Sequence, residues 1–264
     1  MINDEELMEY NFRGFIPGPQ EEVSVFLRRA ELAKYQKSSH QAIVIVQYLF
    51  DVCPNWVRIE PTNRLHLWEA AATYIEENQG IFTPVVQVKK KGVPFWCSQE
   101  EILAHELIHA TRIAFKESLF EEVLAYKTSR NFLRRYFGPI FFHPKEVMVF
   151  LFLLIGTWCY QWGYVFFFEV LPNLTLWIPC ILIGLLIIRV MIVQTIFSLC
   201  LKKIGKLLKQ PNKALGFALR LSDREIIDFA FTSLGKMRKY VGKAREKSLR
   251  WHMLTLMYPM ENRY

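Results

Sequence analysis

The sequence is poor in the features that build several common classes of protein. Its 264 residues contain 12 glycines and 12 prolines, with no repeat of the kind that builds a collagen-like or solenoid chain. The five cysteines include no Cys-x-x-Cys pair, so a cysteine-ligated zinc site has no ligands, and their odd number indicates reduced thiols. Residues 1–17 are acidic and polar, so we expect no export through a signal peptide.

Apolar residues are abundant and unevenly distributed. They make up 52% of the chain, which excludes a disordered protein. Residues 147–168 carry no charge, and residues 174–201 are interrupted only by Arg189 and Gln194. Because about 20 apolar residues suffice for a helix to cross a bilayer, each stretch predicts a transmembrane helix. The short linker, which contains Pro172 and Asn173, predicts that the two helices form a hairpin.

The charges indicate an orientation for this hairpin. Residues 1–146 carry 17 basic and 19 acidic side chains, residues 202–264 carry 15 and 5, and the linker carries no lysine or arginine. The positive-inside rule therefore predicts that both termini are cytoplasmic, at the inner or plasma membrane if the protein is bacterial. We expect Arg189, near the end of the second span, to extend toward the cytoplasmic interface rather than to function within the membrane.

The chain is thus expected to have three parts: a cytoplasmic domain (1–146), a transmembrane hairpin (147–201) and a basic helical tail (202–264). We expect the tail to lie against anionic lipid, with a helix opening at the capping box Ser222–Glu225. No nucleic-acid-binding motif accompanies its charge, so we predict no nucleic-acid partner.

Local patterns predict the elements of the first domain. Residues 20–37 have the spacing of an amphipathic helix, whereas the apolar stretch 42–52 fits a buried strand or a helix. Residues 65–77 are expected to form a helix, and residues 81–89 a strand. The sequence Ser-Gln-Glu-Glu at 98–101 is a capping box that predicts the start of a helix.

That helix carries the most specific motif in the sequence, His105-Glu-Leu-Ile-His109. Two histidines four residues apart lie on one helical face, so their imidazoles can bind one zinc ion. Glu106 lies beside the first histidine, where its carboxylate can reach a metal-bound water. This is the HExxH signature of zinc peptidases.

A third ligand is expected from residues 118–126, which predict a second helix with two adjacent carboxylates. Here the sequence resembles the gluzincin branch of the zincin superfamily. His105, Glu106 and His109 match its first motif, and Glu122-Val-Leu-Ala-Tyr126 approximates its second, glutamate-x-x-Ala-Asp. Tyr126 replaces the aspartate that orients a ligating histidine in the family, and the gap between the motifs is short. Glu122 is the favoured third ligand, and Glu121 is the alternative.

The resemblance implies the fold and the chemistry. It implies an α-rich α+β, zincin-like domain with a small edge sheet, and hydrolysis of peptide bonds in which one zinc ion polarises the carbonyl and Glu106 is the general base. Tyr126 is a candidate oxyanion donor. Arg112 is a candidate substrate contact, for which a plain surface position is the stronger alternative. An edge strand borders the cleft in zincins, and residues 83–88, with Pro84, are the candidate.

Two functions remain open from the sequence. The leading one is a membrane-anchored zinc metallopeptidase that acts on a membrane-proximal peptide or protein substrate, since about 24 residues separate Glu122 from the first span. The alternative is a non-catalytic membrane protein whose basic tail binds lipid or partner proteins.

Overall fold

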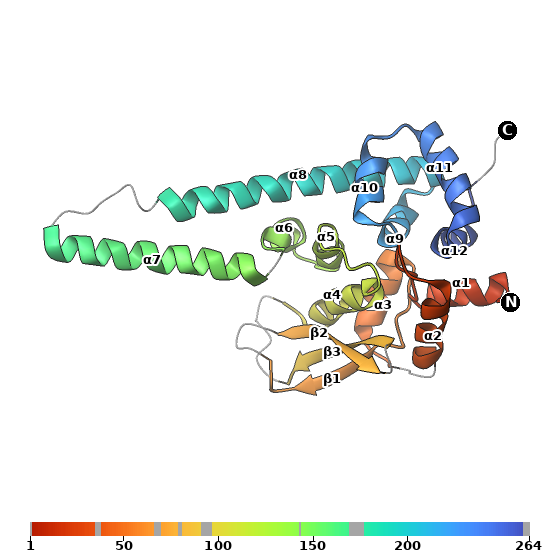
Figure 1. Ribbon diagram of the computed structural model, residues 1–264, viewed down its shortest axis with the longest axis horizontal. Helices are drawn as coiled ribbons and strands as arrows, with labels where there is room; N and C mark the ends of the chain where they lie inside the picture. Colours follow the sequence, from red (N-terminus) through yellow and green to blue (C-terminus); the bar gives the residue numbers. More distant parts are fainter. Residues whose placement is uncertain are drawn as a thin grey trace.

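The computed structural model describes residues 2–34, 38–65, 70–78, 81–90, 97–142, 144–168 and 177–260. It is rich in helix and contains one small sheet, as expected for an α-rich α+β chain (Figure 1). The α-helices are α1 (Asp4–Phe12), α2 (Val23–Lys34), α3 (Gln41–Phe50), α4 (Gln99–Arg112), α5 (Glu121–Tyr126), α6 (Phe132–Phe137), α7 (Pro144–Phe168), α8 (Trp177–Leu208), α9 (Ala214–Leu219), α10 (Asp223–Phe231), α11 (Leu234–Lys247) and α12 (Leu249–Met257). Short 3-10 helices are η1 (Gly138–Ile140) and η3 (Pro211–Lys213), and the strands are β1 (Arg58–Thr62), β2 (Ala71–Asn78) and β3 (Ile81–Lys89).

Two long helices, α7 and α8, project from one side of the molecule (Figure 1). Both are long and apolar enough to cross a membrane, and they coincide with the predicted spans over residues 147–168 and 177–201. Large apolar side chains on α7 face outward, with Phe152 78% and Phe166 83% exposed. Within water such surfaces are unfavourable, at roughly 25 cal/mol per Å² of apolar area. The linker of the predicted hairpin lies outside the described residues.

Arg189 is held by an ion pair where the two long helices meet the rest of the molecule. Its guanidinium donates to both carboxylate oxygens of Glu146, at 2.6 and 2.8 Å, and to the Ile140 carbonyl oxygen at 3.0 Å. Glu146 lies in the first turn of α7. The charge therefore has an internal partner at the base of the hairpin.

The sheet differs from the sequence prediction in two ways. Its strand order is β1-β3-β2, so β3 is the central strand and the prediction of an edge strand at residues 83–88 was wrong. Pro84 is tolerated because the parallel ladder with β1 begins one residue later, at Arg58 opposite Val85, and makes no use of a donor at Pro84.

The second difference concerns residues 71–77, which were expected in a helix and form β2 instead. They pair with β3 in an antiparallel ladder from Ala71 opposite Val88 to Asn78 opposite Ile81. The helical spacing is outweighed by this pairing with the neighbouring strand, which satisfies backbone donors and acceptors between the two strands.

The chain after α8 folds back onto the amino-terminal half (Figure 1). One hydrophobic core contains Phe15, Phe50 and Leu107 together with Phe217 and Trp251. The second half of α8 enters this core through buried residues such as Phe197 and Ile204. We call α9–α12 the C-terminal bundle. It packs on the rest of the protein, because α12 contacts α1, α9 contacts α3 and α10 contacts α8.

Buried arginine binds the C-terminal bundle to the first helices. Arg220 is 1% exposed, and its guanidinium donates to the Asn11 side chain at 2.6 Å and to the carbonyl oxygen of Phe50 at 3.2 Å. The predicted capping box is present, since Ser222 accepts from the Glu225 amide and Glu225 accepts from the Ser222 amide. The helix that it opens ends at Phe231, earlier than the basic sequence suggested.

Candidate functional site

The site is built on α4, whose start is fixed by its cap. Ser98 accepts a hydrogen bond from the Glu101 amide at 3.1 Å, as the sequence predicts. The Glu101 carboxylate does not complete the box. It accepts instead from the Arg130 amide at 3.2 Å and lies 3.5 Å from the Arg134 guanidinium. The helix is therefore tied to the segment that leads into α6, while apolar residues such as Leu107 bury its other faces.

His105, His109 and Glu122 converge on one point, and we call them the His-His-Glu cluster. The two Nε2 atoms are 3.1 Å apart. Carboxylate oxygens of Glu122 lie 3.6 Å from Nε2 of His105 and 3.5 Å from Nε2 of His109. Tetrahedral zinc with bonds of about 2.0–2.1 Å requires neighbouring ligand atoms about 3.3 Å apart. The spacing and the nitrogen and oxygen donors therefore fit such an ion.

The cluster is partly open to solvent. The side chains of His105, His109 and Glu122 retain 14%, 18% and 25% of their accessible surface. A catalytic zinc site needs three protein ligands and a fourth position that a water or substrate can reach. Among the described residues, these three are the one group of histidine, cysteine and acidic side chains placed to hold a metal ion.

Glu121 occupies a different position from Glu122. Its carboxylate oxygen lies 2.7 Å from Nδ1 of His109, on the side of the ring away from the cluster. A carboxylate at this nitrogen fixes the tautomer and orientation of a metal-binding imidazole. Glu121 thus holds the orientation of the His109 ring. The sequence treated Glu121 only as an alternative ligand.

The two histidines differ in their affinity for protons. Burial lowers the pKa of His105 well below its ordinary value, and the nearby positive charges of His109 and Arg134 lower it further. Burial also disfavours a charged His109, but the hydrogen bond to Glu121 and the charges of Glu106 and Glu122 outweigh it and raise its pKa to about 9. Without a metal, a proton on Nε2 of His109 therefore points at Nε2 of His105.

Glu106 is held by β2. Its Oε2 atom accepts a hydrogen bond from the Thr73 hydroxyl at 2.7 Å, and the same hydroxyl lies 3.1 Å from the Glu106 carbonyl oxygen. A fixed carboxylate loses less conformational freedom when it acts as a base. The prediction from the sequence did not include Thr73, because residues 65–77 were expected to form a helix.

Tyr126 borders the cluster through His105. The two rings make an edge contact with centroids 4.6 Å apart, and burial raises the pKa of Tyr126 to about 12, so the phenol keeps its proton at neutral pH. Gly138 makes room for the ring, since a β-carbon there would lie 2.2 Å from Cδ1 of Tyr126. Arg134, which the sequence did not single out, places its guanidinium 5.8 Å from the Tyr126 ring centre and donates to Sγ of Cys97.

Arg112 fits neither role that the sequence allowed. It is fully buried, and its guanidinium donates to the carbonyl oxygens of Leu219 and Leu221 at 2.7 and 2.9 Å. The same group lies 3.7 Å from Glu117 and 3.8 Å from Asp223. Arg112 is therefore neither a surface residue nor open to a substrate. It joins α4 to the C-terminal bundle.

The loop between α4 and α5 is also held in place by the C-terminal bundle. The carboxylate of Asp223 accepts from the amides of Leu119 and Phe120, at 2.8 and 3.3 Å. The Asp223 amide donates to Glu117 at 2.7 Å. Because Glu121 follows Phe120 directly, the start of α10 helps to set where both carboxylates of α5 lie.

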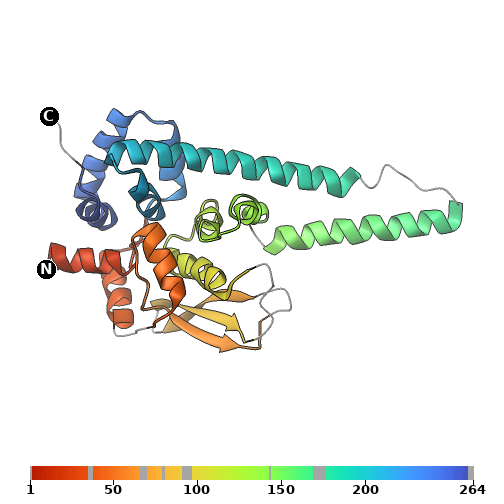
Figure 2. The same ribbon diagram turned by 180° about the vertical axis from the view of Figure 1, so that it is seen from behind.

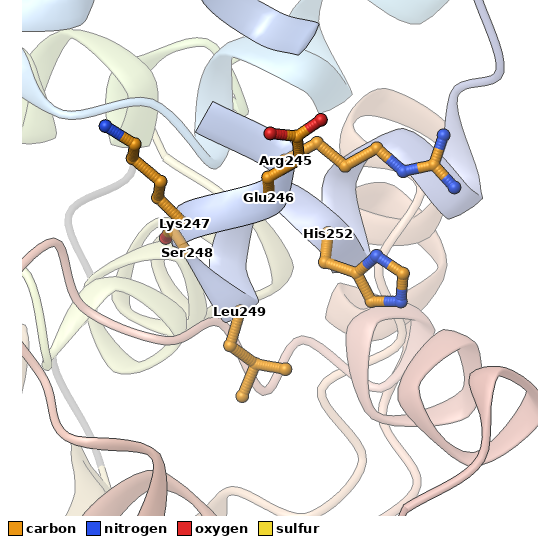
Figure 3. Close-up of a pocket in the computed structure, with 6 residues that line it drawn as sticks. All are labelled: Arg245, Glu246, Lys247, Ser248, Leu249 and His252. Carbon is orange, nitrogen blue, oxygen red and sulfur yellow. The ribbon is translucent and has the colours of Figure 1, made fainter. Parts of the chain in front are cut away.

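The remaining histidines and pockets offer no comparable arrangement among the described residues. His252 pairs with Asp4 at 2.9 Å and lines a shallow pocket between α11 and α12. In Figure 3 the charged side chains around this pocket, Arg245 and Lys247 included, point away from one another. His40 precedes α3 without a side-chain cap, and His66 and His143 lie outside the described residues.

Comparison of the chain with protein-family models, with curated proteins and with solved structures finds no significant match. The resemblance to gluzincins therefore rests on the two short motifs.

Proposed function

We propose that the protein is a membrane-anchored zinc metallopeptidase, with His105, His109 and Glu122 as the ligands of one zinc ion. The observation that carries this proposal is the convergence of two imidazole nitrogens 3.1 Å apart with the Glu122 carboxylate, whose two oxygens lie 3.5 and 3.6 Å from them. Glu106 lies beside the first histidine on α4. Bound zinc would act as a Lewis acid toward a peptide carbonyl and would lower the pKa of a water molecule.

Glu106 is the proposed general base. It takes a proton from the attacking water, and the same carboxyl then gives a proton to the departing amine. Thr73 positions it through the 2.7 Å hydrogen bond. Tyr126, protonated at neutral pH, is the proposed donor to the oxyanion.

The substrate backbone is expected along β2 rather than β3. β2 lies at an edge of the sheet, and its Thr73 contacts Glu106. An edge strand has unpaired backbone groups with which an extended peptide can form hydrogen bonds. The sequence predicted the edge strand at residues 83–88, which lie in β3. The strand proposed here for the substrate is its neighbour, β2.

The membrane assignment rests on α7 and α8. Their exposed apolar surfaces suit a hydrocarbon environment, and the pair of Arg189 with Glu146 marks the end of that environment.

We propose that both termini are cytoplasmic and that substrates are membrane-proximal proteins or peptides. Reporter fusions at the two ends of the chain should both report the cytoplasm, and a signal from the opposite side at either end would overturn this topology.

The peptidase proposal is tested by comparing protein termini in cells that express the wild type or Glu106→Gln. New termini should depend on Glu106, and the purified wild type should cut the same peptides only when zinc is present. The variant should still bind zinc, because Glu106 is not a ligand. Absence of Glu106-dependent termini, together with absence of bound zinc, would favour the non-catalytic membrane protein instead.

A further inference from the structure

A groove separate from the His-His-Glu cluster runs between α3 and the α5–α6 junction, with α9 at one end. It has a volume of about 460 Å³. Three basic side chains, Lys127, Arg130 and Arg135, line it together with apolar residues of α3, and no acidic residue lines it. Figure 2 shows α3 in orange with α5 and α6 in green beside it, below α8. We call this feature the basic groove.

The cations of the basic groove retain donors for a ligand. Lys127 uses one hydrogen bond, to the Gln194 side chain at 2.9 Å, although an ammonium has three donors. Arg135 donates from Nε and one terminal nitrogen to the Ser129 carbonyl oxygen. Arg130 is 81% exposed, with its nearest carboxylate, that of Glu101, 4.0 Å away. The basic groove therefore attracts anions, and its positive charge is only partly offset inside the protein.

The other wall of the basic groove is apolar. Val44 and Tyr48 on α3 are 65% and 86% exposed, although α3 is otherwise a buried helix of the core. Exposed apolar surface beside clustered cations suits a ligand that is itself amphiphilic, with an anionic group and hydrocarbon.

The position of the groove relative to the long helices narrows the choice of ligand. Gln194, the partner of Lys127, lies five residues beyond Arg189 on α8, which is about 7 to 8 Å along a helix. The headgroup region of a bilayer leaflet is about 5 to 8 Å deep. Phe132 and Leu133 at the start of neighbouring α6 are 66% and 64% exposed, as expected at such an interface. The basic groove thus lies at headgroup level if Arg189 marks the edge of the hydrocarbon.

We propose that the basic groove binds the headgroup of an anionic phospholipid, with the phosphate at Lys127, Arg130 and Arg135 and the hydrocarbon near Val44 and Tyr48. The proposal rests on the membrane-spanning assignment of α7 and α8, but not on peptidase activity. Lys127 follows α5 directly, so a lipid bound here would lie one helical turn from Glu122.

The test uses the full chain, purified in a neutral detergent and examined by native mass spectrometry. The probes are a phosphatidylglycerol and a phosphatidylcholine with identical acyl chains. The wild type should retain the anionic lipid in preference. The double variant Arg130→Gln/Arg135→Gln should reduce its affinity roughly 25-fold, at about 5-fold for each cation, and leave the zwitterionic lipid unchanged.

A matched control removes two exposed cations of the C-terminal bundle, Arg245 and Lys247 (Figure 3). The double variant Arg245→Gln/Lys247→Gln should keep the lipid preference. A third variant, Tyr48→Glu, adds a negative charge at a position so exposed that folding does not depend on it, and it should also lose the preference.

The proposal is overturned if the groove variants keep the wild-type preference, or if the control loses it equally. Circular dichroism identifies any variant that is misfolded. If the Arg130→Gln/Arg135→Gln variant is misfolded, the lipid preference of Tyr48→Glu decides whether the proposal stands. Extraction by alkaline carbonate separately tests the membrane assignment. A chain that is released without detergent has no spanning helices. A chain that stays in the membrane but shows no lipid preference refutes only the proposed lipid binding by the basic groove.

Discussion

Two groups of polar side chains contact α4 and α5, and they differ in the partners to which they bond. In the His-His-Glu cluster, two ring nitrogens and a carboxylate face one another at 3.1 to 3.6 Å. In what we call the C-terminal clamp, Arg112, Asp223, Glu225 and Arg250 bond mainly to backbone groups or to one another.

The difference suits the His-His-Glu cluster to the proposed zinc site and the C-terminal clamp to holding the fold together. Donors directed at backbone carbonyls, such as Nη1 of Arg112, are already satisfied and have a structural effect. Nitrogen and carboxylate oxygen atoms that converge on one centre form a position that a metal ion can occupy. We infer that the clamp positions the cluster, and the following experiments test whether the two are distinct.

The largest effect is expected from removing a ligand. His105→Ala should lower bound zinc from about one ion per chain to less than about 0.1, because two protein ligands rarely hold zinc in water. His252→Ala is the matched control, since that histidine pairs with Asp4 away from the cluster. Zinc content is measured by elemental analysis of the purified chain. Equal zinc in both variants would exclude the cluster as the binding site.

The clamp should affect stability more than metal affinity. Glu225 accepts from Arg250 through both carboxylate oxygens at 2.8 Å, with both side chains less than 10% exposed. Glu225→Gln leaves the buried guanidinium without its counter-charge and should cost about 3 to 5 kcal/mol in the free energy of unfolding. Glu246→Gln, at an exposed position of α11, should cost little. Thermal unfolding followed by circular dichroism compares the two.

The same pair predicts a pH dependence. Burial favours the protonated form of Glu225, but the hydrogen bonds and charge of Arg250, with those from Ser222 and Trp251, outweigh it and lower its pKa. Its contribution to stability is therefore complete above about pH 4.5 and is lost as the pH falls through the lowered pKa. The stability difference between wild type and Glu225→Gln should shrink below that pH. A difference that is constant down to pH 2 would contradict this explanation.

Glu121 should have an intermediate effect that distinguishes it from a ligand. Glu121→Ala removes the partner of Nδ1 of His109 and should weaken zinc binding about 10- to 100-fold without abolishing it. Competition with a fluorescent zinc chelator gives the dissociation constant, and Glu246→Ala, at an exposed position of α11, serves as the comparison. If Glu121→Ala loses zinc as completely as Glu122→Ala, Glu121 is a zinc ligand rather than the hydrogen-bond partner of a ligand.

The smallest effect is expected at Thr73. Thr73→Val removes one hydrogen bond to Glu106, worth about 0.5 to 1.5 kcal/mol, and should reduce kcat roughly 2- to 10-fold with zinc content unchanged. Thr73→Ser should restore the rate, since it keeps the hydroxyl. A rate equal to that of the wild type in Thr73→Val would show that Thr73 does not position the base.

The sequence predicted those parts of the molecule that short-range signals determine. The spacing of His105 and His109 fixes them on one helical face, Ser98 caps α4, and two long apolar stretches form α7 and α8. Glu122 was favoured as the third ligand on a motif alone, and the structure brings it to the two imidazoles.

Long-range contacts determine the parts that the sequence did not reveal. Residues 71–77 have helical spacing but pair with β3, which moves Thr73 to Glu106. The positive charge after α8 suggested a surface tail, yet Arg220 and Arg250 are buried, because charge counts carry no information about burial. Arg112 shares α4 with His105 and His109, but its guanidinium donates to carbonyl groups more than 100 residues distant in sequence.

The central claim is that His105, His109 and Glu122 bind zinc directly, and X-ray absorption at the zinc edge of the purified chain tests it most directly. The predicted spectrum contains two imidazole nitrogens and one or two further oxygens at about 2.0–2.1 Å, with no sulfur. In Glu122→Ala the two imidazole nitrogens should remain in any zinc still bound, at lower occupancy. A sulfur shell at about 2.3 Å, or fewer than two imidazoles in the wild type, would contradict the assignment.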